Sequence, residues 1–275
     1  MRVYSPKEYW AALADKFHSA DPTGFAPILH PGAPAWFNVS IDGLQFRAMR
    51  RALALAEVAP GARVLDVGCG TGRWLRRYLS LGLNATGVDG TPRMLWVART
   101  RGTTAPLAAG EANHLPFGDE EFDVVSDVTV IQHIPAAQQP QALLEMTRVL
   151  KPGGRVILFE LIRGDDSHIF PRSPQGWMDL GASCGLRTRG WFGQEYLLLD
   201  RFFVRVAQGV MKRRETAGAV GRESGEIMLP RPSMLRRVYW GMRHATVPLS
   251  VWAEPVVGRL SSGGLATHGV FVFQK

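Results

Sequence analysis

The sequence contains little cysteine and no long hydrophobic run. Its two cysteines, Cys69 and Cys184, are not part of a CxxC pair, which argues against a disulfide framework or a zinc knuckle. The seven histidines show no HxxxH or HExxH spacing, so we expect no metal site. No apolar segment reaches the ~18–20 residues that span a bilayer, and the first residues lack an apolar leader. We therefore expect a cytoplasmic protein without a transmembrane segment.

The composition is that of an ordinary globular protein. Of the 275 residues, 46% are hydrophobic and 20% are charged, which suffices for one substantial core. The formal charge of +8 favours anionic partners such as nucleic acid or an acidic membrane face. No lysine-rich run stands out, so we interpret the charge as a solvated basic surface. An acidic or phosphorylated small-molecule partner stays open as the alternative.

Strands alternate with helices through the middle of the chain. We expect strands at residues 63–67, 85–88, 105–109, 122–130 and 155–161, with helices at 72–80, 91–99 and 139–150 between them. Helices are also expected at 5–17 and, capped by Asp42, at 44–58, and a sharp turn at 151–154. This alternation is typical of parallel βαβ units and predicts an α/β fold with a doubly wound sheet.

The end of the chain departs from this alternation. A helix at 173–184, capped by Ser173, a strand at 186–192 and a final strand at 268–273 enclose a mostly helical, basic segment. We predict three parts: an N-terminal helical lid (1–60), a core (61–194 and 262–275), and a helical insertion (195–261) that caps the acceptor site.

A glycine-rich segment, VLDVGCGTG, follows the first of these strands. Such a turn lets a ligand approach the backbone and directs helix N–H groups at it. A P-loop is excluded because no Gly-Lys-Ser/Thr follows, and the GxGxxG pattern of dinucleotide sites ends in Arg73. The acid Asp66 would repel a pyrophosphate but suits the cationic S-adenosylmethionine. Asp89 ends the next strand, where ribose hydroxyls are held in this kind of fold.

Four motifs in order resemble the class I S-adenosylmethionine-dependent methyltransferases. They are VLDVGCGTG, GVDGTPRML, GEANHLPFGDEEFDVV and RVLKPGGRVIL, and they cover residues 63–161. The sub-pattern LPFxxxxFDVV with a later LKPGG resembles the small-molecule group of quinone, sterol and natural-product pathways. The resemblance implies a seven-stranded, mostly parallel, Rossmann-like sheet with S-adenosylmethionine as cofactor.

The resemblance also implies roles for particular residues around the cofactor. It places Gly68 and Gly70 against the methionine and adenosine portions, Asp66 near the amino group and Asp89 on the ribose. It places Met94 over one adenine face, Glu111 and Ala112 at the adenine edge, and the backbone carbonyl of Asp127 on the methionine ammonium. The family usually has Asp at the position of Glu111.

Two residues are candidates for the catalytic base. His133 follows the strand at 122–130, and Glu160 lies near the end of the strand at 155–161. The carboxyl ends of neighbouring strands share one crevice, where methyl transfer to a hydroxyl needs a base. We predict that His133 takes the proton and that Glu160 orients it or holds the substrate. The alternative is that His133 packs the loop before Pro135.

The acceptor-binding residues are predicted from aromatic and basic side chains near the site. They are Tyr9, Arg172, Trp177, Trp191 and Tyr196. The sequence predicts an S-adenosylmethionine-dependent methyltransferase of a small molecule, most simply an O-methyltransferase of secondary or glycan metabolism. An RNA methyltransferase, and N-, S- or C-methylation of a small molecule, stay as alternatives, although no NPPY-type turn or appended RNA-binding module is present. Oligomeric state is not indicated.

Overall fold

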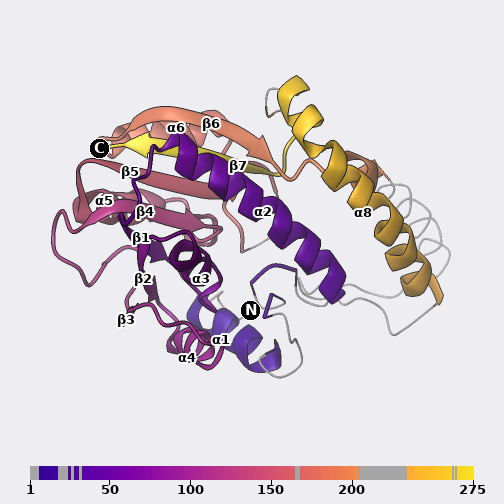
Figure 1. Cartoon of the computed structure of the whole chain (residues 1–275), viewed down its shortest axis with the longest axis horizontal. Helices are drawn as coiled ribbons and strands as arrows, with labels where there is room; N and C mark the ends of the chain where they lie inside the picture. The colour runs from indigo at the N-terminus through magenta and orange to yellow at the C-terminus, as the bar shows by residue number, and fades with distance from the viewer. Residues whose placement is uncertain are drawn as a thin grey trace.

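The computed structural model describes residues 6–17, 24–25, 28–30, 33–164, 168–202, 204, 234–261, 263 and 265–275. Its helices and strands follow the alternation expected from the sequence (Figure 1). The helices are α1 (Pro6–Phe17), α2 (Ala35–Leu55), α3 (Arg73–Ser80), α4 (Pro92–Thr100), the 3₁₀ helix η1 (Ile131–His133), α5 (Gln139–Val149), α6 (Pro174–Ser183) and α8 (Met234–Leu260). The strands are β1 (Arg63–Val67), β2 (Asn84–Asp89), β3 (Leu107–Ala109), β4 (Phe122–Val128), β5 (Leu150–Leu161), β6 (Arg187–Gln194) and β7 (His268–Gln274).

The strands form one seven-stranded sheet in the order β3-β2-β1-β4-β5-β7-β6. Strands β1 to β5 pair in parallel, whereas β7 runs antiparallel to both β5 and β6. The predicted doubly wound, mostly parallel sheet is therefore confirmed. The order of the strands reverses between β1 and β4, and ligands of doubly wound sheets bind at the carboxyl ends of the strands beside such a switch.

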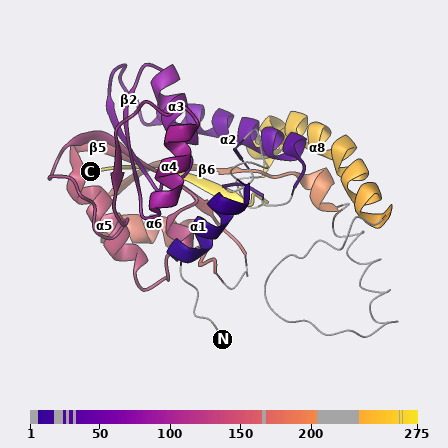
Figure 2. The same ribbon diagram turned by 90° about the horizontal axis from the view of Figure 1, so that it is seen from below.

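Helices cover both faces of the sheet (Figures 1 and 2). Successive side chains of a strand point to opposite faces: Val125 packs with residues of α5 and α6, and its neighbour Val124 packs with residues of α2 and α3. The strands are apolar on both faces because both faces are covered, as the runs in the sequence indicate.

Helix α2 differs from the prediction because it begins at Ala35, directly after Pro34. Asp42, predicted to cap a helix starting near residue 44, is instead a buried residue inside α2. Its carboxylate accepts hydrogen bonds from the guanidinium groups of Arg73 and Arg77. The two cations compensate the burial of this charge, which a sequence pattern for capping does not reveal.

Two further boundaries can be compared with the sequence. The predicted turn at 151–154 lies within β5, so the chain passes from α5 into the strand without a separate loop. The predicted cap of α6 is confirmed, because Ser173 Oγ accepts a hydrogen bond from Gly176 N at 3.1 Å.

The N-terminal helices have different positions. Helix α1 packs on α4, where Arg93 Nε donates to Asp15 Oδ1 at 2.5 Å, whereas α2 packs against β6, β7 and α8. Of the predicted insertion, α8 packs against α2 and β6. Residues 205–233 of that insertion lie outside the described residues.

Candidate active site

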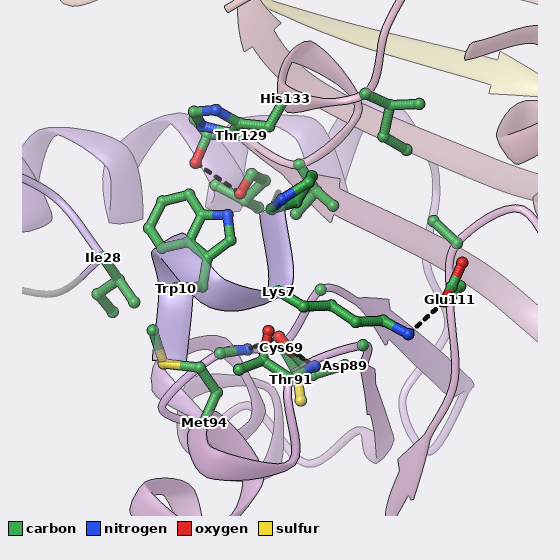
Figure 3. Close-up of a pocket in the computed structure, with 18 of the residues that line it drawn as sticks. Lys7, Trp10, Ile28, Cys69, Asp89, Thr91, Met94, Glu111, Thr129 and His133 are labelled. Carbon is green, nitrogen blue, oxygen red and sulfur yellow. Dashed lines mark hydrogen bonds and ion pairs between the residues drawn. The ribbon is translucent and has the colours of Figure 1, made fainter. Parts of the chain in front are cut away.

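A pocket of about 540 Å³ lies at the carboxyl ends of β1, β2 and β4 (Figure 3). Its walls come from the turn after β1, the start of α4, residues 110–113, residues 128–138, and α1 with Ile28. Six of the predicted cofactor-binding residues line it: Gly68, Gly70, Asp89, Met94, Glu111 and Ala112. Lining residues from Pro6 to Gln138 therefore come together where the motifs indicated.

The glycine turn leaves room for a ligand only because side chains are absent. Gly68 has φ +66° and Gly70 has φ +52°, in the left-handed region that glycine tolerates best. A Cβ placed on Gly68 would lie 2.3 Å from Val130 Cγ2, and one on Gly70 would lie 3.3 Å from Ile28 Cγ2. At Gly68, both the backbone conformation and the close approach of Val130 require glycine.

Asp89 fixes the shape of the turn and faces the pocket. Its Oδ2 accepts from Gly70 N and its Oδ1 from Thr91 N, both at 2.8 Å. Burial raises the pKa of Asp89, while these backbone donors oppose the shift. Each carboxylate oxygen has a second lone pair, so the group can accept from two ribose hydroxyls while it holds the turn.

The adenine side of the pocket is closed by a contact between distant segments. Met94 is buried and packs with Ala14 of α1. Lys7 of α1 reaches across the pocket to form an ion pair with Glu111 (Figure 3). The longer arm of Glu111 thus has a partner that the sequence did not indicate.

Asp66 does not line the pocket but lies behind the glycine turn. It is buried, and its Oδ1 accepts from Ser126 Oγ at 3.2 Å. Burial raises the pKa of Asp66 to about 8. Its Oδ2 has no hydrogen-bond partner among the described residues. The acid is thus mostly protonated near neutral pH and makes no direct contact with the pocket.

Arg73 and Trp74 line the pocket and were missed in the sequence. Arg73 Nη1 donates to Asp42 Oδ1 at 3.1 Å and to Gln45 Oε1 at 2.8 Å, and burial lowers its pKa to about 10. The buried Nε atom of Arg73 and Nε1 of Trp74 have no acceptor among the described residues. The signal in the sequence was weak, since the partner acid lies 31 residues earlier.

These groups fit the predicted cofactor. S-adenosylmethionine carries a carboxylate, an ammonium, a ribose diol and an adenine. The pocket offers a cation with unpaired N–H groups beside the turn, an acid behind it, the carboxylate of Asp89 and the apolar Met94. Each part of the molecule therefore finds a group of suitable charge or polarity.

His133 lines the other end of the pocket, in a defined tautomer. Leu161 N donates to Gln132 Oε1 at 2.8 Å, which leaves the Gln132 amide nitrogen, a donor, 3.4 Å from His133 Nε2. His133 Nδ1 lies 3.4 Å from the carbonyl oxygen of His168. A carbonyl only accepts, so Nδ1 carries the proton and Nε2 is unprotonated, with its lone pair directed at the Gln132 amide.

The surroundings of His133 keep its ring neutral. Burial and the neighbouring His168 lower its pKa to about 4. The ring makes an edge contact with Trp10 at 5.1 Å between centroids and stacks on His168 at 5.7 Å. His133 is thus unprotonated near neutral pH and is held by aromatic neighbours.

Glu160 and Asp127 lie behind the pocket and hold the segment that carries His133. Glu160 Oε1 accepts from Ile131 N at 2.8 Å and its Oε2 from Gln132 N at 3.2 Å, and Asp127 Oδ1 accepts from Val130 N at 3.0 Å. Neither side chain lines the pocket. Burial and the mutual repulsion of the two acids raise the pKa of Glu160 well above its usual range, and burial raises that of Asp127 to about 7.

Of the two roles predicted for Glu160, these contacts fit orientation of His133 rather than substrate binding, and the role predicted for the backbone carbonyl of Asp127 stays a prediction. Glu160 is placed to position η1 rather than to touch a substrate, and the pocket wall beyond Asp127 is made by Val128, Thr129 and Val130. Thr129 has φ +59°, which turns the chain between β4 and η1.

The five predicted acceptor-binding residues do not line the described pocket. Trp177 is fully buried, with Nε1 donating to Leu161 O at 3.0 Å, and Tyr196 is buried in the same core. Trp191 stacks on Phe271, with 5.7 Å between the ring centroids. The sequence identified these side chains as aromatic but not as core.

The other two of these five residues, Arg172 and Tyr9, lie nearer to the pocket. Arg172 Nε donates to Gln139 Oε1 at 2.5 Å and its Nη2 to Ala136 O at 3.0 Å, which supports the loop behind η1. Tyr9 contacts the rings of Trp10 and His168. Around His133 the pocket is lined instead by Trp10, Ile134, Pro135 and Gln138, whereas Ile28 lies beside Gly70 and Met94.

Comparison with known proteins matches residues 65–158 to a family described as methyltransferase domain. A demethylmenaquinone methyltransferase of Renibacterium salmoninarum is 38% identical over 128 residues, which cover 45% of this chain and 53% of that protein. A probable tRNA methyltransferase 9B of Homo sapiens is 36% identical over 106 residues, or 38% of this chain and 22% of that protein. The chain thus spans about half of the first relative and less of the second.

A solved structure resembles nearly the whole chain. It is a putative sarcosine dimethylglycine methyltransferase from Galdieria sulphuraria, with a TM-score of 0.53, 18% identity, and 86% of each chain covered. At this identity the likeness shows the fold alone, and it includes the mostly parallel seven-stranded sheet.

Proposed function

Because residues 65–158 form a methyltransferase domain in a chain with the fold of class I S-adenosylmethionine-dependent methyltransferases, we propose that the whole protein methylates a small, apolar, ring-bearing molecule at an acidic hydroxyl. S-adenosylmethionine is the cofactor of this enzyme family. When bound, it supplies a methyl group already activated by a positively charged sulfur.

One observation carries the proposal: the neutral ring of His133, whose unprotonated Nε2 is held by Gln132 alone among the described residues, lines the same pocket as the glycine turn and Asp89. The pocket would have a polar cofactor end and an acceptor end walled by Trp10, Ile134 and Pro135. An apolar ring fits such walls and can stack on the indole. A small molecule between the two ends would present its hydroxyl to the imidazole.

The chain's own groups would align the acceptor and receive its proton. His133 Nε2 would accept the hydroxyl proton once the Gln132 amide gives way, while Nδ1 stays hydrogen-bonded to His168 O. A base with a pKa near 4 removes a proton efficiently only from an acceptor that is itself acidic, such as a phenol or an enol. Closure of the pocket by α1 would exclude water from the reacting atoms.

The pairing of the positively charged side chains of the pocket disfavours an acidic or phosphorylated acceptor. Its two lysine or arginine side chains, Lys7 and Arg73, are paired with Glu111 and Asp42. The same pairing leaves little free positive charge for an RNA backbone. A cytoplasmic setting in secondary metabolism is part of the proposal and rests on the sequence; an amine, thiol or carbon acceptor is the main alternative.

The test is a set of methylation assays with isotopically labelled S-adenosylmethionine and matched aromatic acceptors. Phenols, anilines and thiophenols of one ring size are compared with an RNA transcript, and label transfer is followed by mass spectrometry. We expect transfer to phenols. Transfer to anilines or thiophenols alone would reject the hydroxyl acceptor, and transfer to RNA alone, with a steep salt dependence, would reject the small-molecule function.

A further inference from the structure

Helix α8 has one face packed on the rest of the protein. Val247 and Ser250 are buried, and Ser250 Oγ accepts from Asp200 N at 3.3 Å. Glu254 points inward, where its Oε1 accepts from Glu195 N at 2.5 Å. Arg243 also faces inward and pairs with Asp200. The polar side chains of α8 are thus used to attach it to the fold.

The opposite face of α8 is exposed and apolar. Leu249 is 57% exposed, Trp252 82% and Val256 56%, and they recur at the three- to four-residue spacing of one helix face. Met242, Ala245, Pro248 and Pro255 are exposed as well. From Met242 to Val256 this apolar face extends for about 21 Å at the rise of an α-helix. We call these seven residues the outer face of α8.

The outer face continues the apolar character of its surroundings. The segment before residue 203 contacts α8 through Asp200 and exposes Leu199 and Phe202. For comparison, Trp96 on α4 is exposed on one side but is covered by the guanidinium of Arg93 at 4.0 Å. Apolar surface of this extent marks an interaction site more often than chance exposure does.

The exposed charge next to the outer face is positive. Arg259 is the exposed charged side chain of α8 between 241 and 259, and Glu254, the acid of that stretch, is turned inward. The chain as a whole carries a formal charge of +8. Two copies of the chain meeting through this face would bring positive surfaces together, whereas an anionic surface would attract it.

We propose that the outer face of α8 docks the protein onto an anionic lipid surface. Tryptophan and arginine next to aliphatic side chains are the composition of helices that lie in the membrane interface. No helix among the described residues is long and apolar enough to cross a bilayer, so the contact is peripheral. The lipid headgroups are met by the basic charge and the acyl boundary by Leu249, Trp252 and Val256.

The experiment is vesicle flotation of the full-length protein. Vesicles of phosphatidylcholine with an equal part of phosphatidylglycerol are compared with pure phosphatidylcholine, and bound protein is quantified. We expect binding to the anionic vesicles, weaker binding at high salt, and a blue shift of the tryptophan emission. Trp252→Ser should lower the vesicle partition coefficient roughly tenfold or more, because a large apolar side chain no longer enters the interface.

Trp96→Ser is the matched control, since it removes an exposed tryptophan far from α8 in sequence and should leave the partition coefficient unchanged. Circular dichroism establishes that both variants are folded, and the readout does not depend on methyl transfer. Equal binding of the wild type and Trp252→Ser, or no binding to anionic vesicles, would overturn the proposal. Self-association that Trp252→Ser abolishes, without vesicle binding, would assign the face to a second copy instead.

Discussion

The cofactor end of the pocket and its acceptor end draw on the chain in different ways. At the cofactor end, the ligand-facing groups lie in short motifs directly after β1 and β2, and glycine backbone makes much of the wall. At the proposed acceptor end, Trp10 of α1 and His133 of η1 come from two distant segments and meet only through the fold. The first end is fixed by local chain geometry, whereas the second depends on tertiary packing.

Replacing the base should have the largest effect and should touch only the acceptor end. We expect His133→Ala to lower kcat by about 10²–10⁴-fold, the usual contribution of a positioned base, with an unchanged dissociation constant for S-adenosylmethionine. Steady-state kinetics with a phenolic acceptor measures this, and the exposed His114→Ala is the control. The wild-type rate should fall only as the pH drops towards 4, and this acidic limb should vanish in the variant. A loss below about tenfold would mean that His133 only shapes the pocket.

The cofactor end can be tested with two glycines that differ in one respect. Gly68 and Gly82 both have positive φ, but a Cβ on Gly82 has no atom within 4 Å, whereas one on Gly68 meets Val130. Both alanine variants should lose about 1 kcal/mol of stability from the backbone conformation. We expect only Gly68→Ala to weaken S-adenosylmethionine binding, by roughly tenfold or more, in calorimetric titrations. Equal affinities in the two variants would show that the approach to Val130 does not matter.

The carboxyl pair behind η1 should influence catalysis indirectly. Glu160→Ala removes the acceptor for Ile131 N and Gln132 N, so the loop should shift and kcat should fall by about tenfold, comparable to the loss of one or two hydrogen bonds. Glu160→Gln keeps an accepting oxygen and should recover much of this. The dissociation constant of S-adenosylmethionine should stay the same in both. If Glu160→Gln is as impaired as Glu160→Ala, the carboxyl group has a direct chemical role.

The smallest expected effect is a pH-dependent gain in stability. Burial raises the pKa of Asp66 to about 8 in the folded state, above its usual value of 3.8. An acid with a raised folded pKa stabilises fully at low pH and loses that contribution as the pH rises from about 4 to 8. Asp66→Asn should therefore raise Tm relative to the wild type by a few degrees more at pH 8 than at pH 5. Scanning calorimetry at the two pH values measures the difference, and an equal Tm difference would refute the buried, neutral acid.

The features that depend on local chain geometry could be predicted from the sequence, whereas those that depend on tertiary packing could not. Strand and glycine positions could be predicted because they depend on local patterns, so the sheet is as predicted and six of the residues predicted to bind the cofactor line one pocket. Trp177 and Tyr196 were predicted to bind the acceptor but are buried in the core. A single sequence does not distinguish an aromatic side chain of the core from one of a binding site. The pairing of Asp42 with Arg73 and that of Lys7 with Glu111 join segments far apart in the chain, which periodicity does not reveal.

The central claim is that one pocket has a cofactor end at Asp89 and a separate acceptor end at His133. It is tested most directly by calorimetric titration of S-adenosylmethionine into the wild type, Asp89→Ala and His133→Ala, with Asp123→Ala, a half-buried acid that does not line the pocket, as control. Asp89→Ala removes the carboxylate that accepts from the ribose hydroxyls, so its affinity for S-adenosylmethionine should fall by about ten- to a hundredfold. His133→Ala and Asp123→Ala should bind S-adenosylmethionine as the wild type does. Normal affinity in a folded Asp89→Ala, or a comparable loss in His133→Ala, would contradict the account.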